Sequence, residues 1–216
     1  MSTYAELELR CKRRLGRRGM TITTEFLDEM KAAQEKLERN PTLPRFLKVR
    51  EPGVGAAGAT TLVNPADFIR FYDDAGIEYT IDGTTEKKFA TRLDTFQQLQ
   101  SKINNGIPEG QMFYFIDESS SGITFRINEQ TEDFSYAYRY YKKQPVLTGA
   151  NDNKWTTGPQ AEYIMAMAGV ELAVWLRDDR ALKYFTDLEA KERRSMVSQI
   201  ESDEWGDTDL VMGDPD

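Results

Sequence analysis

One run of glycines matches the phosphate-binding pattern GxGxxG letter for letter: Gly53-Val54-Gly55-Ala56-Ala57-Gly58. In dinucleotide-binding proteins these glycines open a helix within a βαβ unit, so that the helix N-terminus meets the pyrophosphate. Here Pro52 precedes the run, and residues 59–65 after it favour a strand and end in Asn64-Pro65. The context therefore favours a flexible glycine-alanine loop that makes contacts, and a nucleotide-binding enzyme that uses Gly53–Gly58 is a remote alternative.

Other side chains with catalytic potential are few. The chain has no histidine, which eliminates Ser-His-Asp and Cys-His catalysis and most zinc and iron sites. The single cysteine, Cys11, lies on the apolar face of a predicted helix and is interpreted as a core thiol. Three acidic pairs have no second motif that converges on them: Asp73-Asp74, Asp117-Glu118 and Asp178-Asp179. The sequence thus predicts no enzyme, no catalytic residue, no cofactor and no metal.

Charge is distributed unevenly along a chain of net charge −8. Residues 1–50 hold 12 Lys and Arg against 7 Asp and Glu, whereas residues 201–216 hold 7 acidic residues and no basic ones. Five of the seven residues in Lys12–Arg18 are basic, but no reading helix or aromatic set for DNA accompanies them. The asymmetry fits head-to-tail contact between copies or contact with a charged partner, and solvated chain ends are the alternative.

Helical periodicity predicts the elements at the two ends of the chain. Residues 3–15 and 23–39 form an N-terminal hairpin of two amphipathic helices, the second with Thr23 or Thr24 at its start. Helices over 159–177 and 179–201 follow near the C-terminus. The N-terminus lacks the apolar region of a signal peptide, so we expect synthesis in a cytoplasm and no membrane association.

The middle of the chain, about 44–145, reads as a small antiparallel β module. Alternating apolar residues predict five strands, at 47–50, 77–81, 112–116, 123–127 and 134–140. Residues 119–122, Ser-Ser-Ser-Gly, predict a hairpin turn. A short helix is expected at 94–104 with Asp94 as its N-cap.

Residues 161–176 form the most apolar stretch, interrupted only by Glu162 and Glu171. A helix that is apolar on nearly every face must be enclosed. It is therefore central to a small domain, or it is covered partly by its own chain and partly by a neighbouring copy. The run is shorter than the roughly 20 residues that a bilayer needs. For Glu171 we expect a structural partner, with a local opening to water as the alternative.

The last segment, 202–216, is acidic and is expected to have no fixed shape alone. Its apolar residues are spaced among acids, as in segments that dock into a groove. We predict that Trp205, Leu210, Val211 and Met212 are the anchors of a docking tail, and an unstructured end without a partner is the alternative.

The ordered set of features resembles the head-to-tail adaptor, or connector, proteins of tailed bacteriophages of the podovirus type. The resembling elements run over most of residues 3–200: 3–7, 43–50, 140–147, Asn153-Lys154-Trp155, Pro159, Glu171 and Asp178-Asp179. The glycine stretch 52–65 and the helix at 94–104 depart from the family pattern as local elaborations.

The resemblance implies a structural virion protein at the head–tail interface. Such adaptors form a ring of copies, usually a dodecamer, that binds the portal protein and the tail nozzle and encloses a channel for double-stranded DNA, without binding it specifically. The tail would reach a portal groove. Packing between subunits would involve the apolar helix and the basic end of the first helix, through Ile164, Met167, Trp175, Arg13 and Arg17.

The predicted fold class is α+β, mainly α. A helical bundle, made of the N-terminal hairpin and the two C-terminal helices, carries the inserted β module and an extended C-terminal tail. Residues 1–201 are expected to form a single adaptor domain, and 202–216 the docking tail. Another head-completion, neck or tail-tube assembly protein is the alternative function.

Overall fold

The structure, a computed structural model, describes residues 3–16, 22–72, 76–108, 110–119, 122–149 and 151–206, apart from the side chains of residues 119 and 203–206. The chain forms two compact units. Residues 1–47 and 144–216 are called the helical unit here, and residues 48–143 the β unit. The predicted α+β class is confirmed. Among the described residues, no helix is long and apolar enough to cross a membrane.

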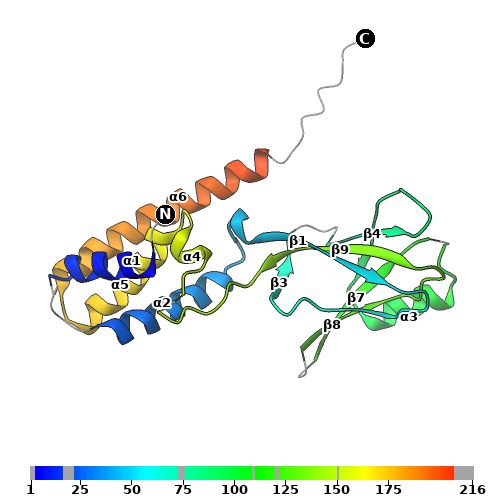
Figure 1. Ribbon diagram of the computed structural model, residues 1–216, viewed down its shortest axis with the longest axis horizontal. Coiled ribbons are helices and arrows are strands. Elements are labelled where there is room, and N and C mark those ends of the chain that lie inside the picture. The colour runs from blue at the N-terminus through cyan, green and yellow to red at the C-terminus, as the bar shows by residue number, and fades with distance from the viewer. Residues whose placement is uncertain are drawn as a thin grey trace, which may run out of the picture. The chain divides into compact units, whose positions relative to one another are not determined.

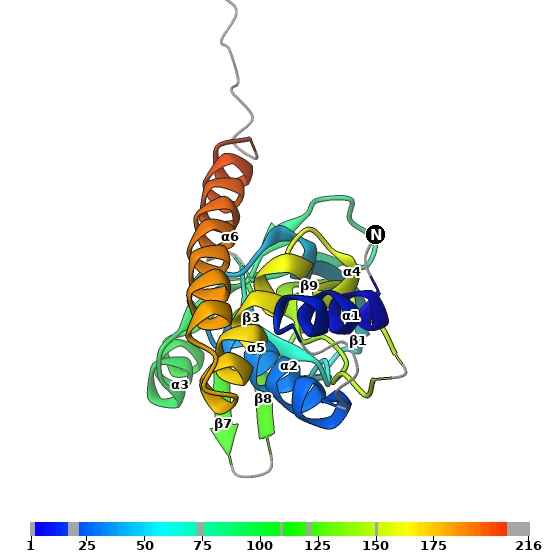
Figure 2. The ribbon, with the colours of Figure 1, turned by 90° about the vertical axis from the view of Figure 1, so that its left-hand side faces the viewer.

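The helical unit surrounds one apolar helix, α5, with elements from both ends of the chain (Figures 1 and 2). α5 contacts α1, α2, α4 and α6. The elements of this unit are α1 (Tyr4–Arg14), α2 (Thr23–Glu38), the 3-10 turn η1 (Arg45–Leu47), α4 (Lys154–Thr157), α5 (Ala161–Trp175) and α6 (Asp179–Gly206).

The two N-terminal helices begin differently. α1 starts with a capping box, in which the Thr3 side chain accepts from the Glu6 amide and the Glu6 side chain accepts from the Thr3 amide. α2 begins at Thr23, one of the two predicted starts, and its N-cap is Ile22, so no side chain caps it. α1 buries Cys11 completely. Burial, the main cause, raises the pKa of the Cys11 thiol to about 12, which fits a core thiol and not a nucleophile.

The chain's own helices cover most of α5. Ten of its 15 residues are buried. Ile164 is fully buried and Met167 is 7% exposed, so both side chains pack within their own helical unit, and their role in packing between subunits stays a prediction. A helix without an apolar stripe carries no sequence signal for the face that its own chain covers. Among the apolar residues of α5, only Val174 and Trp175 at the C-terminal end are largely exposed, at 54% and 58%.

A tight turn separates α5 from α6. Arg177 takes a left-handed conformation with φ 54°. The Asp178 side chain accepts from the Ala181 amide at 2.9 Å, and this bond caps the start of α6. α6 then continues to Gly206. The first residues of the predicted tail are therefore helical, because residues 201–206 contain no helix breaker before Gly206 and extend a helix that is already formed.

The β unit contains two sheets. The first, sheet A, has the strand order β1-β9-β4-β5, and β3 also pairs with β9. Its strands are β1 (Lys48–Gly55), β3 (Phe68–Phe71), β4 (Ile77–Ile81), β5 (Lys88–Phe89) and β9 (Phe134–Lys142), all antiparallel. β1 lies at one edge of this sheet.

The second, sheet B, has the order β2-β8-β7-β6. Its strands are β2 (Thr61–Leu62), β6 (Thr91–Leu93), β7 (Phe113–Ser119) and β8 (Gly122–Ile127). β7 and β8 form the predicted hairpin, whose tip lies outside the described residues. The β6–β7 pair is parallel, which corrects the expectation of a purely antiparallel module. Helix α3 (Phe96–Asn104) makes the connection that a parallel pair requires.

The core of the β unit lies between the two sheets and is aromatic. Phe134, Tyr136, Tyr138 and Tyr140 of β9 pack with Tyr114 and Phe125 of sheet B. α3 contacts β6 and β7. Its N-cap is Thr95, whose side chain accepts from the Gln98 amide at 3.2 Å, so the prediction of Asp94 is one residue off.

Candidate functional site

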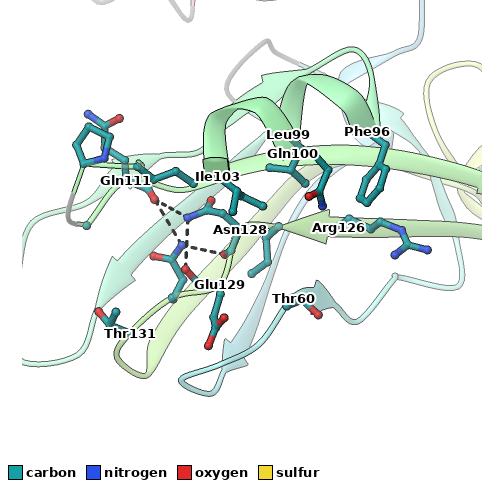
Figure 3. A pocket seen from close by; sticks show the side chains of 15 residues that line it. Thr60, Phe96, Leu99, Gln100, Ile103, Gln111, Arg126, Asn128, Glu129 and Thr131 are labelled. Carbon is teal, nitrogen blue, oxygen red and sulfur yellow. Dashed lines mark hydrogen bonds between the residues drawn. The ribbon is translucent and has the colours of Figure 1, made fainter. Parts of the chain in front are cut away.

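A groove of the β unit runs along α3 (Figure 3). It encloses about 570 Å³. Phe96 and Ile103, which are 45% and 42% exposed, lie on the α3 side. Asn128 and Gln130, from the segment that follows β8, line the groove with buried side-chain amides.

These amides are used internally. Asn128 Oδ1 accepts from the Phe113 amide at 2.6 Å, and Asn128 Nδ2 donates to the Gln111 carbonyl at 3.1 Å. Gln130 Nε2 donates to the Asn128 carbonyl at 3.1 Å and to the Gln111 carbonyl at 3.4 Å. The amides therefore hold the loop after β8 against β7, and the groove offers an apolar wall beside fixed polar groups.

The charged groups of the groove do not form a catalytic set. Arg126 Nε donates to Asp117 at 2.7 Å, and the guanidinium lies over the Phe96 ring at 5.6 Å from its centre. Asp117 of the acidic pair Asp117-Glu118 is therefore engaged in an ion pair. The arrangement of an apolar helix wall, amides and one fixed cation suits contact with a protein segment more than acid–base chemistry.

The glycine motif does not open a helix. Gly53 and Gly55 belong to β1, directly opposite Tyr136 and Phe134 of β9. A Cβ on Gly53 would lie 2.4 Å from the Tyr136 ring, and one on Gly55 would lie 2.1 Å from the Phe134 ring. The two glycines thus leave room for aromatic rings that lie across the neighbouring strand. Residues 53–55 of the expected loop thus belong to a strand. The spacing of Gly53 and Gly55 reflects the two-residue period of that strand.

The basic run at the end of α1 is partly engaged. Lys12 pairs with Glu8, and the Arg14 guanidinium lies 4.6 Å from the centre of the Tyr184 ring on α6. Arg13 is exposed. Arg17 lies outside the described residues, as do the acidic pair 73–74 and the anchors 210–212. The side chain of Trp205 also lies outside them, although its backbone belongs to α6.

Glu171 is exposed and lines a shallow hollow with Glu29, Ala33 and Lys36 of α2. Among the described residues it forms no ion pair or hydrogen bond, so the prediction of a structural partner is wrong and the alternative, an opening to water, holds. The pKa of Glu29 is raised, chiefly by partial burial and then by the charges of Glu171 and Asp28. In the described parts of the chain, no group of three or more acidic or cysteine side chains has the geometry of a metal site.

A buried polar network in the helical unit was missed by the sequence analysis. The Glu38 carboxylate, 6% exposed, accepts from Gln34 Nε2, the Gln144 amide and Trp155 Nε1 at 3.0, 3.2 and 3.0 Å. Asn153 Nδ2 donates to Gln34 Oε1 at 3.0 Å and to the Pro145 carbonyl at 2.8 Å. The network fixes the chain where it returns from the β unit. The sequence does hold one sign of this network: Gln34 and Glu38 follow Met30 at intervals of four residues and so share its buried helix face.

Comparison with known proteins assigns the chain to a family. No curated protein matches it. The profile of the SU10 adaptor protein family matches residues 2–212, which include both units and nearly the whole chain. Two segments that carry the resemblance to phage adaptors, 140–147 and 153–155, supply the Gln144, Asn153 and Trp155 positions of the buried network. The resemblance is therefore confirmed, and the chain belongs to the SU10 adaptor protein family.

Proposed function

We propose that the protein is a structural part of the phage virion that assembles as a closed ring, a dodecamer, between the portal protein and the tail nozzle. The ring encloses the channel through which the double-stranded DNA passes without specific binding. Membership of an adaptor family supports a role in joining other virion proteins. In this role the helical bundle is the body of each subunit, and no catalysis is required of it.

The exposed end of α5 is the observation that carries the ring proposal. α5 is otherwise enclosed by its own chain, yet Trp175 stands 58% exposed next to Val174. Large exposed aromatic residues are the usual anchors of protein interfaces. Because Ile164 and Met167 are covered by their own chain, we assign the subunit contact chiefly to Trp175, with Arg13 and Arg17 of the basic run beside it, in a head-to-tail arrangement that closes on itself.

The choice between an adaptor and another neck or tail-tube component depends on what the ring binds. In the decisive experiment the chain is mixed with the isolated portal. The mass of the product is measured, and the product is imaged by electron microscopy. A ring of copies on the portal supports the adaptor. A ring that forms only on a tail protein, or a chain that never joins the portal, favours the alternative. The nucleotide-binding alternative is disfavoured by the positions of Gly53 and Gly55 inside an antiparallel sheet.

Replacement of Trp175 by serine is expected to weaken ring formation on the portal at least about 30-fold, the equivalent of a 2 kcal/mol anchor. The fold should remain intact because the side chain is mostly exposed. The measurement is the protein concentration at which half of the portal carries a ring, and the unfolding midpoint reports the fold.

Val63→Ser is the matched control for this substitution. Val63 is 79% exposed but lies in the β unit. An equal loss of assembly in both variants, or no loss in Trp175→Ser, would show that Trp175 is not the subunit anchor.

The C-terminal tail is proposed to attach the ring to a portal groove through Trp205, Leu210, Val211 and Met212. Because α6 continues to Gly206, the appropriate truncation removes residues 207–216. We expect an unchanged unfolding midpoint and portal binding at least about tenfold weaker, since three apolar anchors are lost. A tail of the same composition in scrambled order tests whether charge alone suffices. Full-strength binding by the truncated chain would eliminate the docking arm.

A further inference from the structure

The exposed C-terminal end of α5 combines apolar, aromatic and cationic groups. Trp175 and Val174 are 58% and 54% exposed, and Arg177 follows them in the tight turn before α6. The Arg177 side chain is exposed and pairs with none of the described groups. In a ring of identical copies a head-to-tail contact joins two different surfaces of the chain. The surface that receives this end of α5 therefore lies elsewhere on the same chain.

The groove along α3 offers the apolar side of such a receiving surface. Phe96, Leu99 and Ile103 line it from α3, and Phe96 and Ile103 are 45% and 42% exposed. Exposed apolar side chains gathered around a hollow mark sites of protein contact. The groove encloses about 570 Å³, which leaves room for an indole ring and the valine beside it.

Glu129 gives the groove an unpaired negative charge. It lines the groove from the segment that follows β8, across from α3 (Figure 3). Its carboxylate is exposed and accepts no hydrogen bond from the described residues. Arg126, the basic residue among the described lining, is already paired with Asp117 at 2.7 Å. The charge that the groove leaves free is therefore negative, opposite to that of Arg177.

The indole of Trp175 also needs a hydrogen-bond acceptor once it is buried, because its faces are apolar but its Nε1–H is a donor. Trp155 meets the same need inside the helical unit by donating to the Glu38 carboxylate at 3.0 Å. A carboxylate has two oxygens, so Glu129 can accept from the indole and from the Arg177 guanidinium together. The end of α5 and the groove thus match in apolar surface, hydrogen bonding and charge.

We propose that Trp175 of one copy inserts into the groove along α3 of the next copy, with its ring against Phe96 and Ile103 and with Arg177 beside Glu129. This inference rests on the proposed function, because it names the surface that receives the Trp175 anchor of the ring. Each copy contributes one α5 end and one groove, and the contact repeats around the ring until it closes. The helical unit of each copy is joined in this way to the β unit of its neighbour.

Two other occupants fit the groove less well. The segment 207–216 carries four aspartates and no basic residue, and Glu129 with its neighbours Glu132 and Asp133 would repel them. Two α3 grooves from different copies could pack face to face, but such a two-fold contact closes after two copies and builds no larger ring. Both occupants are outcomes of the experiments below.

The first experiment exchanges the two charges. Arg177→Glu and Glu129→Arg are each expected to raise the concentration at which half of the portal carries a ring about tenfold, because like charges then face each other. The chain with both substitutions should return to within about threefold of the wild type, since every contact in the ring again joins opposite charges. The unfolding midpoint of each variant reports the fold.

Glu118→Arg is the matched control for the exchange. Glu118 is an exposed carboxylate on β7 of the β unit and does not line the groove. Alone, this substitution should change assembly by about twofold or less, and it should not rescue Arg177→Glu. Equal rescue by Glu118→Arg and Glu129→Arg would show that net charge governs assembly and would overturn the proposal.

The second experiment maps the contact. A chain with a photo-crosslinking amino acid at Ile103 is mixed with an equal amount of isotopically heavy wild-type chain, assembled on the portal and irradiated. Trypsin and mass spectrometry then locate the adducts. We expect them to join residue 103 to the heavy tryptic peptide 155–177, within residues 172–177. A heavy Trp175→Ser partner should lower their yield at least about tenfold.

The outcomes separate this inference from the proposed function. If rings form and depend on Trp175 but the adducts lie outside 172–177, the groove is not the receiving surface and the ring proposal stands. Adducts on heavy 207–216 or 93–102 identify the tail or a second α3 as the occupant, and adducts within one light chain place the contact inside a copy; each overturns the inference. If no ring forms on the portal, the proposed function fails, and adducts in the concentrated free chain then support the groove contact, whereas their absence overturns it.

Discussion

Replacement of Trp155 by alanine is expected to lower the free energy of unfolding by about 3–5 kcal/mol, as for other large aromatic residues that leave a cavity. Trp155 is fully buried, and its ring lies edge-on to Phe46 at 5.1 Å between centres. Its Nε1–H also donates to the buried Glu38 carboxylate at 3.0 Å. The substitution therefore removes packing and one of three donors from a buried charge. Chemical denaturation followed by circular dichroism measures the loss.

Two further variants separate these contributions. Trp155→Phe keeps most of the apolar bulk but removes the donor, and should cost about 1–3 kcal/mol because the buried carboxylate loses one of its three donors. Trp175→Ala changes an exposed tryptophan and should alter stability by about 0.5 kcal/mol or less. Equal losses for Trp155→Ala and Trp175→Ala would contradict the buried network as a main support of the helical unit.

The position of this network gives the prediction a functional meaning. Gln144, Pro145 and Asn153 are joined to α2 through Glu38 and Gln34, directly after the last residue of the β unit. Lys154 Nζ also donates to the Phe46 carbonyl at 3.0 Å, just before the β unit begins. Both crossings of the chain are thus tied to α2 or α4. In the adaptor role proposed above, these contacts hold both connecting segments to the helical unit.

The long strands could be predicted from the sequence because each has one buried face. The alternation at 77–81, 123–127 and 134–140 coincides with β4, β8 and most of β9. β2 lies inside residues 59–65, which were expected to favour a strand, whereas β3, β5 and β6 were missed, since two to four residues do not establish a period. Their pairing follows from the long strands beside them. The parallel β6–β7 pair could not be foreseen, because its direction depends on the path of α3.

The candidate site was predicted less well, for a reason seen in single residues. Gly53 and Gly55 read as a phosphate loop because the sequence does not show which residues lie opposite them. Only the register shows that the two glycines, by lacking a side chain, leave room for the rings of Tyr136 and Phe134. The groove along α3 depends in the same way on tertiary contacts, since α3 and the segment after β8 lie apart in the sequence. Trp175, in contrast, lies at a helix end that the sequence predicts, so its position was easier to foresee.

Substitution of Gly169 by valine is expected to destabilise the helical unit by about 3 kcal/mol or more, at the upper end for overpacked cores. A Cβ at this position would lie 2.4 Å from Phe185 Cδ1 and 2.6 Å from its Cγ. These atoms are near the root of a fully buried ring, so the ring cannot simply rotate away. Gly169 is thus where α5 and α6 approach closely, and the gain of about 1 kcal/mol from removing a helical glycine cannot offset the clash.

The partner of the clash supplies the test. Glu171→Val, on an exposed position of the same helix, measures the cost of a β-branched residue alone and should stay within about 1 kcal/mol. Phe185→Ala is destabilising by itself, but combined with Gly169→Val it should lose less than the sum of the two single variants, by about 1–3 kcal/mol. Thermal or denaturant unfolding of the four proteins completes the cycle. Strict additivity would mean that the valine acts elsewhere. If Gly169→Val alone does not fold, recovery of folded protein in the double variant still identifies the close approach of Gly169 and Phe185 as the cause. This approach fixes how α6 packs on α5, and α6 carries the proposed docking tail at its C-terminal end.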